Sequence, residues 1–354
     1  MIVAFPYFGT GTIALRMFFQ DLGARVMLPP VPTRRTLELG VLHSPEQICL
    51  PFKITLGSLI EAAELGAEAL FMAAGTRKCR FGYYHLLQET ILARLHPNVR
   101  FYGLAQYSVT DFVFRRVPEI FGISPRRVAV AVANLLRRSA LIAEFDRQVR
   151  RLRALDFPRA EAAIGQGLRM LERIAQAGCI PSVRRDLRRL FNTGQKRPEM
   201  RIALIGEVYL LSEPFANLDI ERQLGRLGVE VVLERSLYNH LRHLLKSEFR
   251  FIQTALYARR YIQESPGGEV VKTLGEAVRQ ARAGVGGIVH IFPFTCMPEN
   301  MALEILQKIG RDYRVPVMSL SFDEHTGQAG LVTRLEAFVD VVRRQRLRVL
   351  RKCA

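Results

Sequence analysis

The stretches Ser44-Pro-Glu-Gln-Ile-Cys49-Leu-Pro-Phe-Lys53 and Gly75-Thr-Arg-Lys-Cys79-Arg-Phe-Gly-Tyr-Tyr84 place two cysteines thirty positions apart, each at a turn before a predicted helix. Pro51 suits the first turn of a helix, where the N–H that proline lacks has no partner. Apolar residues then recur at helical spacing, and residues 69–73 predict a short buried strand that Cys79 follows. Because a thiol at a helix N-terminus faces the positive end of the helix dipole, we expect both cysteines to have a lowered pKa.

A third cysteine repeats this arrangement near the C-terminus. Residues 286–292 predict a strand, Cys296 follows its carboxyl end, and Pro298 precedes a predicted helix at residues 300–309. The carboxyl ends of parallel strands gather ligands in one crevice of an open α/β sheet. We therefore expect Cys49, Cys79 and Cys296 to converge.

Strands and helices alternate along most of the chain, which predicts an α/β fold with two parallel-sheet (Rossmann-like or flavodoxin-like) units and a helical insertion. Predicted strands lie at residues 2–5, 25–28, 69–73, 99–104, 201–205, 229–233, 286–292 and 315–320. Predicted helices include residues 13–22, 213–227, 238–262 and 269–283. We expect an N-terminal α/β domain (1–123) with Cys49 and Cys79, a helical segment (124–198), and a C-terminal α/β domain (199–354) with Cys296.

Composition limits the classes of protein to consider. Hydrophobic residues make up 49% and charged residues 24% of the chain, as in ordinary globular proteins. We find no apolar run long enough to span a membrane, no signal-peptide pattern, and an odd number of scattered cysteines, so we expect a cytoplasmic protein. The net charge of +18 comes from arginines spread over many helices without a nucleic-acid-binding motif, so we expect no nucleic-acid partner.

Three thiolates suit three corners of a [4Fe-4S] cluster and would leave one iron open. A structural zinc site would need four ligands, usually at short paired spacings, which the chain lacks. Buried core cysteines and redox-active thiols remain alternative interpretations. Cys179 and Cys353 lie outside these turns, and we expect core or surface thiols there rather than a fourth ligand.

Other polar residues follow the same predicted strand ends and turns. The candidates for catalysis are Glu46, Tyr83, Glu207, Glu299 and His325. The candidates for compensating the charge of a cluster or donating a hydrogen bond to it are Lys53, Arg80 and Tyr84. Each of these residues is alternatively a surface, capping or packing residue.

Five motifs occur together and in order. They are Cys49-Leu-Pro-Phe-Lys53, Lys78-Cys-Arg-Phe-Gly-Tyr-Tyr84, Ile205-Gly-Glu-Val-Tyr209 with Glu213-Pro-Phe215, Pro293-Phe-Thr-Cys-Met-Pro-Glu299, and Ser321-Phe-Asp-Glu-His-Thr-Gly327 with Arg334-Leu-Glu-Ala-Phe-Val-Asp340. With them the chain resembles the 2-hydroxyacyl-CoA dehydratase and benzoyl-CoA reductase-like superfamily, in its activase-related (CoA-protein-activase-like) branch near the double-cubane cluster proteins. The resemblance covers nearly the whole chain and is weakest between residues 124 and 198.

The resemblance implies a dehydratase-component fold and a cluster held by Cys49, Cys79 and Cys296. It also implies an iron–sulfur protein that accepts low-potential electrons from an ATP-dependent activase and reduces or dehydrates a small or CoA-linked substrate. The chain has no ATP-binding motif of its own, so ATP hydrolysis would belong to the activase. The alternatives are an electron-transfer or assembly subunit with a cluster but no substrate, and a non-enzymatic nucleic-acid or scaffold protein that uses its positive charge.

Three well-placed cysteines, among the five in the chain, predict one cubane cluster. A larger cluster would need the cysteines of two chains, so we expect a dimer, either of identical chains or with a paralogous subunit.

Overall fold

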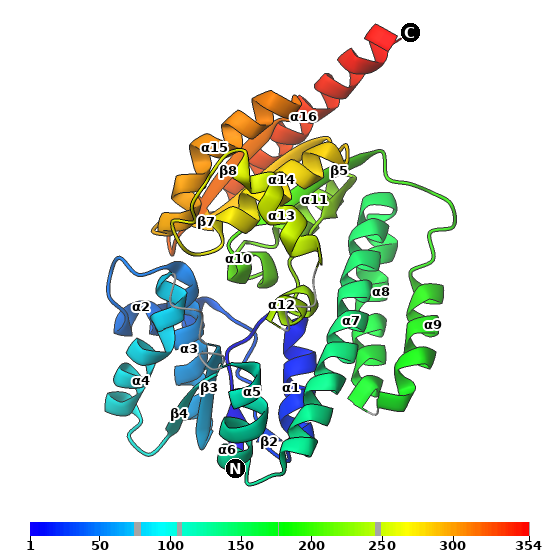
Figure 1. Cartoon of the computed structure of the whole chain (residues 1–354). Helices are drawn as coiled ribbons and strands as arrows, with labels where there is room; N and C mark the ends of the chain where they lie inside the picture. The colour runs from blue at the N-terminus through cyan, green and yellow to red at the C-terminus, as the bar shows by residue number, and fades with distance from the viewer. Residues whose placement is uncertain (74–78, 105–107, 176, 245–248, 354) are drawn as a thin grey trace.

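Over the residues that the structure describes, the chain folds around two four-stranded parallel sheets with the same strand order (Figure 1). The computed structural model describes residues 1–73, 79–104, 108–175, 177–244 and 249–353, without the side chains of residues 177, 243, 244, 249–251 and 348–353. The first sheet has the order β2-β1-β3-β4 and the second β6-β5-β7-β8. The strands are β1 (Ile2–Ala4), β2 (Arg25–Val26), β3 (Ala69–Ala73), β4 (Arg100–Leu104), β5 (Met200–Gly206), β6 (Val229–Val232), β7 (Gly287–Pro293) and β8 (Val317–Phe322). The predicted α/β class with two parallel sheets is confirmed.

Side chains along β1 and β3 point alternately to the two faces of the first sheet, and helices cover both faces. Val3 and Phe71 pack with α1 (Gly11–Asp21) and α7 (Pro125–Leu155), whereas Ala4 and Leu70 pack with α3 (Leu50–Glu64) and α4 (Tyr84–Leu95). Helix α2 (Arg34–His43), which the sequence analysis did not predict, lies against α3. The two backbones touch at Gly40, where an added Cβ would lie 1.7 Å from the carbonyl oxygen of Lys53.

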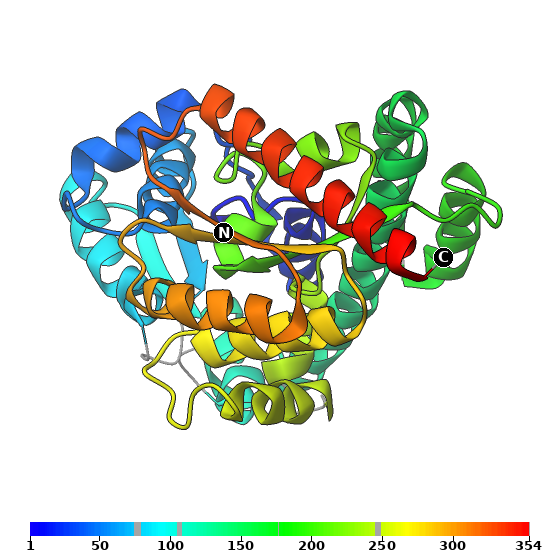
Figure 2. The same ribbon diagram turned by 90° about the horizontal axis from the view of Figure 1, so that it is seen from above.

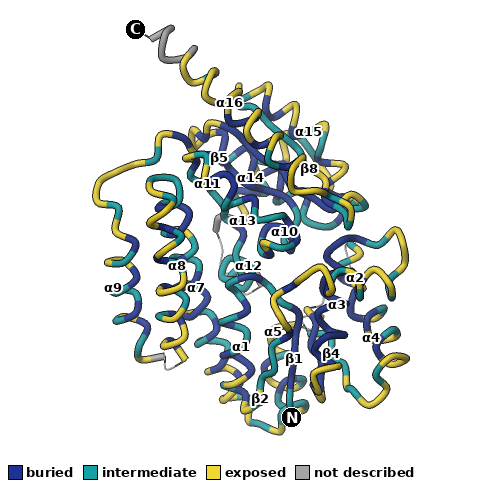
Figure 3. The backbone as a smooth tube through the Cα atoms, turned by 180° about the vertical axis from the view of Figure 1, so that it is seen from behind, coloured by how far each residue is buried: buried dark blue, intermediate teal, exposed yellow. Residues whose placement is uncertain are grey.

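The second sheet is covered in the same way. Ile202 and Leu204 face α11 (Ile220–Arg226) and α16 (Gln328–Cys353), while Ala203 and Ile205 face α14 (Val270–Arg282) and α15 (Met297–Tyr313). Viewed from above, α16 crosses diagonally over this sheet (Figure 2). The described residues of α16 that follow Val342 are exposed or half-buried (Figure 3).

A group of helices lies between the two sheets in sequence. Ser124 and Pro125 begin α7 as predicted, and Asp156 ends α7 and caps the next helix by accepting the N–H of Arg159. Helix α7 contacts α1 on one side and α11 and β6 on the other, so it touches both units. The group consists of α5 (Val109–Asp111), η2 (Phe112–Arg116), α6 (Val117–Phe121), α7, α8 (Phe157–Glu172), η3 (Arg173–Ala175), η4 (Ala177–Cys179) and α9 (Ile180–Leu190).

The single helix predicted at residues 213–227 is wrong. Helix α10 (Val208–Ser212) ends before Glu213, and α11 begins at Ile220. Between them Leu218 and Asp219 adopt positive φ angles, which an α-helix does not contain. The helix predicted at residues 238–262 corresponds to α12 (Leu237–Leu244) and α13 (Phe249–Arg259), and residues 245–248 lie outside the described residues.

Among the described helices, none combines the length and the apolar character needed to cross a membrane.

Candidate functional site

In each sheet the first strand along the chain, β1 or β5, has the second strand on one side and the third strand on the other. This order creates a topological switch point, which is where ligands bind in open α/β folds. These switch points lie between β1 and β3 and between β5 and β7. Cys79 follows β3, Glu207 follows β5, and Cys296 follows β7. All three residues line a single cavity of about 1720 Å³ to which both units contribute.

Each of the three cysteines occupies the position just before a helix, as the sequence predicted. Cys49 precedes α3, Cys79 precedes the 3-10 helix η1 (Arg80–Tyr83), and Cys296 precedes α15. Contacts at Gly268 show how closely the second and third turns approach each other. A Cβ added there would lie 3.5 Å from the Cβ of Cys79 and 2.6 Å from Cγ of Pro298, so the Cys79 turn and the start of α15 are neighbours.

Cys49 lies close enough to the other two thiols to help raise the pKa of both Cys79 and Cys296. Over the part of the chain that the structure describes, no three His, Cys, Asp or Glu side chains lie close enough to hold one metal ion. That result does not exclude a cluster, since the ligands of a cluster bind different iron atoms and stand farther apart than the ligands of one ion.

The expectation that a helix N-terminus lowers the pKa of the thiol is wrong for Cys79, and the pKa of Cys296 is raised as well. Burial raises the pKa of both, and the Glu299 carboxyl adds to the effect at Cys296. Backbone N–H groups oppose the change: those of Phe81 and Gly82 at Cys79, and that of Glu299 at Cys296. The metal-free protein therefore holds thiols here, and metal binding must release protons.

Tyr84 and Arg80 position the first two cysteines. The buried hydroxyl of Tyr84 donates a hydrogen bond to the Cys49 sulfur, and its ring packs against Phe52 and Phe81 with centroids 5.1 Å away in each case. Nη1 of Arg80 donates to the carbonyl of Gln47 at 2.8 Å. The Cys79 turn is thus attached to the turn that precedes Cys49.

Lys53 connects the two units instead of facing the cysteines. Its side chain is buried, and Nζ donates to the carbonyl of Glu46 at 3.0 Å and to the Glu324 carboxylate. Glu324 belongs to the loop after β8. Charge compensation of a cluster by Lys53, expected from the sequence, is therefore not what this geometry favours.

The Glu207 carboxyl lies near the thiols of Cys79 and Cys296. Its carboxylate accepts the N–H groups of Tyr209 at 3.0 Å and Leu210 at 2.9 Å. Burial, with a contribution from Glu269 and Glu299, nevertheless raises the pKa of Glu207 to about 7. Because Glu207 also raises the pKa of Cys79 and Cys296, its carboxyl lies near both thiols.

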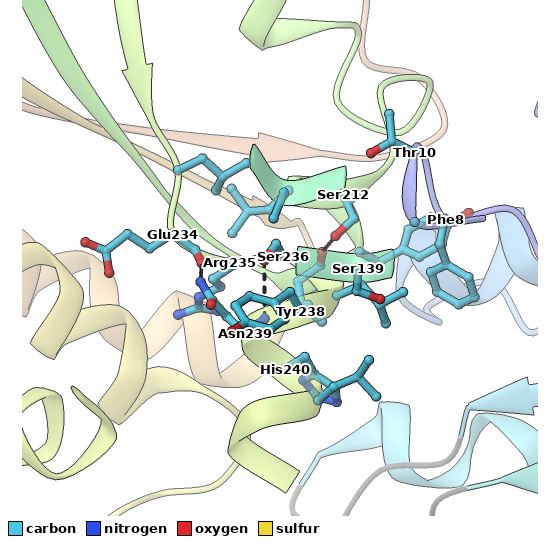
Figure 4. Close-up of a pocket in the computed structure, with 18 of the residues that line it drawn as sticks. Phe8, Thr10, Ser139, Ser212, Glu234, Arg235, Ser236, Tyr238, Asn239 and His240 are labelled. Carbon is cyan, nitrogen blue, oxygen red and sulfur yellow. Dashed lines mark hydrogen bonds between the residues drawn. The ribbon is translucent and has the colours of Figure 1, made fainter. Parts of the chain in front are cut away.

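A buried polar network supports Glu299 behind Cys296. The Glu299 carboxylate contacts Nε2 of His290 at 2.9 Å and accepts the hydroxyl of Thr273 at 2.9 Å. Nη2 of Arg235 donates to Thr273 at 2.7 Å, and Nε of Arg235 pairs with Glu276 at 2.9 Å. Figure 4 shows Arg235 in the cavity wall near Ser236, Tyr238 and Asn239.

The structure places the other candidates away from the cavity. Glu46, Tyr83 and His325 are exposed and do not line it. Cys179 lies just before α9, packed against the core around α7, far along the chain from the three cysteine turns. The side chain of Cys353 is outside the described residues.

Asp146, Thr10 and Arg235 also line the cavity and were not among the residues predicted from the sequence. For Asp146 a signal existed, because it follows Ile142 by four residues on the apolar face of α7. Arg235 follows β6 without any pattern that distinguishes it from the many other arginines.

Replacing Glu207 with Gln is expected to change how stability depends on pH. A carboxyl whose pKa is about 7 in the folded protein and 4.5 unfolded stabilises the fold below pH 4.5, and this contribution is lost as the pH rises through 7. In iron-free protein, the free energy of unfolding of Glu207→Gln should fall by up to about 3 kcal/mol less than that of the wild type over this rise in pH. At low pH the variant should be about 1 kcal/mol less stable, since its amide accepts only one of the two N–H groups well.

Urea unfolding of both proteins between about pH 5 and pH 8 measures this difference. Glu304→Gln, at an exposed position on α15, serves as the matched control. Parallel pH curves for wild type and Glu207→Gln would show that the carboxyl titrates normally.

No protein-family model matches this chain, and a search of curated proteins finds no similar sequence.

Proposed function

We propose that this chain is an iron–sulfur protein of the 2-hydroxyacyl-CoA dehydratase-like type, with Cys49, Cys79 and Cys296 as ligands of a [4Fe-4S] cluster. The observation that carries the proposal is that Cys79 and Cys296, which follow strands of two separate sheets, line one large cavity, with Cys49 close enough to affect the pKa of both. Cysteines that only filled the hydrophobic core would need neither such a cavity nor a neighbouring carboxyl group. The helical segment and the two sheets suit a dehydratase-component fold.

The residues fit such a cluster chemically. Three thiols are available, backbone N–H groups point at two of them, and the acid beside them can be neutral near pH 7. A cluster bound there would supply low-potential one-electron transfer and one iron open to the cavity. Thiols of this kind require a reducing compartment such as the cytoplasm.

The protein side chains would order the site and move protons. Tyr84 orients Cys49, and the network of His290 and Thr273 orients Glu299. Glu207 can hold or release a proton at its carboxyl oxygen near neutral pH, next to a molecule in the cavity. We assign no role to Glu46, Tyr83 or His325. The size of the cavity favours a protein that acts on a small or CoA-linked substrate over a simple electron carrier.

An ATP-dependent activase would be the electron donor, and the chain would form a dimer with itself or a paralogous subunit. Exposed apolar side chains near Cys296 support a protein partner at this surface: Phe294 is 64% exposed and Met297 is 54% exposed. A cluster larger than one cubane would require the cysteines of two chains.

Anaerobic purification followed by iron and sulfide analysis tests the proposal. We expect about four irons and four sulfides per chain, a broad visible absorption, and a dimer by light scattering. Addition of activase, ATP and a reductant should then support turnover of an acyl-CoA. Absence of iron after anaerobic reconstitution with iron and sulfide would refute the cluster; a full cluster without turnover would leave the electron-transfer subunit as the function.

A further inference from the structure

The cavity has a second polar region, formed by α7 and the loop after β1. Asp146 lies on α7, and Thr10 belongs to the loop between β1 and α1. The hydroxyl of Thr10 donates to Oδ2 of Asp146 at 2.9 Å, and both residues line the cavity. Figure 4 shows Thr10, Phe8 and Ser139 in this part of the wall.

The Asp146 carboxyl has acceptor capacity left for a ligand. Among the described residues it accepts this one hydrogen bond and forms no ion pair, although a carboxylate can accept about four hydrogen bonds. The neighbouring arginines are already paired: Arg150 with Glu221 at 3.2 Å and Arg153 with Glu161 at 2.9 Å. Burial, with a contribution from Glu221, raises the pKa of Asp146 to about 6, although Arg150, Arg153 and the Thr10 hydroxyl partly oppose this shift.

Ser139 supplies an independent observation two turns earlier on the same helix. Its side chain is 2% exposed and lines the cavity, and its hydroxyl has no hydrogen-bond partner among the described residues. Buried polar groups are normally hydrogen-bonded, so an unpaired hydroxyl at a cavity wall points to a ligand. Leu135 and Ile142 on α7 and Leu15 on α1 make the wall between these polar groups apolar.

The charges around this region select a neutral ligand. The carboxylates of Asp146 and Glu221 face the guanidinium groups of Arg150 and Arg153, so positive and negative charges balance here and attract neither an anion nor a cation. We propose that Asp146, Thr10 and Ser139 form a binding site for the hydroxyl group of a neutral alcohol whose apolar part lies along α7.

This site is continuous with the cysteine turns. Phe8, two residues before Thr10, packs edge-on against the ring of Tyr209 with centroids 5.4 Å apart, and Tyr209 is two residues after Glu207. An alcohol held by Asp146 would thus extend through the same cavity toward Glu207. The claim that this alcohol is the substrate rests on the proposed function, whereas the claim that it binds does not.

A matched set of ligands on one ring tests the proposal: cyclohexanol, cyclohexylamine and cyclohexanecarboxylate, titrated against the full chain by ligand-observed NMR. Cyclohexanol should bind saturably and more tightly than the other two. Asp146→Asn should weaken its binding roughly tenfold, because hydrogen bonds to a charged acceptor are stronger than those to an amide. Ser139→Ala, which removes an unpartnered hydroxyl and should leave folding intact, should weaken it several-fold. Asp340→Asn on the exposed surface of α16 is the control.

The pH profile gives a second measurement. Lowering the pH from about 8 to about 5 should weaken cyclohexanol binding to the wild type but not to Asp146→Asn, since protonation removes the charge of the carboxyl. The facing groups Arg150, Arg153 and Glu221 are present in both proteins and cancel in the comparison. Preferred binding of the amine or the carboxylate, no saturable binding, or equal affinity in Asp146→Asn would overturn the proposal. Iron content measured on the same samples reports separately on the cluster.

Discussion

Changing Cys49, Cys79 or Cys296 to Ala is expected to reduce bound iron from about four per chain to less than one, in each single variant. The three thiols come from turns before α3, η1 and α15, so each would hold a different corner of the cluster. Loss of one ligand leaves two irons exposed in a solvent-connected cavity, where the cluster should dissociate. Iron and sulfide analysis of anaerobically purified variants measures the effect.

Cys179→Ala is the matched control, because this residue packs in the helical segment away from the cavity. It should retain full iron and the wild-type visible spectrum. Full iron content in the Cys49, Cys79 or Cys296 variant would remove that cysteine from the ligand set. Equal loss of iron in Cys179→Ala would instead show that the variants act through folding.

Arg235→Met is expected to cause the largest loss of stability of any single change in the polar network, roughly 3–5 kcal/mol near pH 7. Arg235 is 4% exposed and Glu276 5% exposed, and Arg235 also pairs with Glu269 at 2.8 Å and with the carbonyl of Gly206. Without the guanidinium, the buried Glu276 carboxyl would lose its partner, and the part-buried Glu269 carboxyl would keep only Lys272. Urea unfolding of wild type and variant measures the difference.

The loss should shrink in acid. Burial opposes ionisation of Glu269, but the charges of Arg235 and Lys272 hold its pKa at about 2. The lowered pKa of Glu269 stabilises the wild-type fold above pH 4.5, and this contribution is lost as the pH falls through 2. Because the variant lacks this contribution, it differs most from the wild type near pH 7 and least in acid. Arg343→Met, at an exposed pair 3.5 Å from Asp340, should cost less than about 0.5 kcal/mol. A similarly small cost for Arg235→Met would show that water reaches the network.

Local patterns were sufficient to predict the strands and several of the helix starts. Short apolar runs identified all eight strands within a few residues, and Ser124-Pro125 predicted the start of α7, because strand periodicity and capping depend on neighbouring residues. Helix α2 was missed although Thr33 and Thr36 form a capping box. The break at Leu218 and Asp219 was missed because positive φ angles at such residues follow from tertiary packing.

The sequence by itself determined that three cysteines precede helices and that two of them, Cys79 and Cys296, follow strands, since these relations are local. Only the tertiary structure decided which residues face them. The two sheets meet at their carboxyl ends, which brings Glu207 beside Cys79 and Cys296 and leaves Glu46, Tyr83 and His325 exposed. The pKa values also depended on the fold, because burial and neighbouring carboxyl groups outweigh the local effect of the helix N-termini at Cys79 and Cys296.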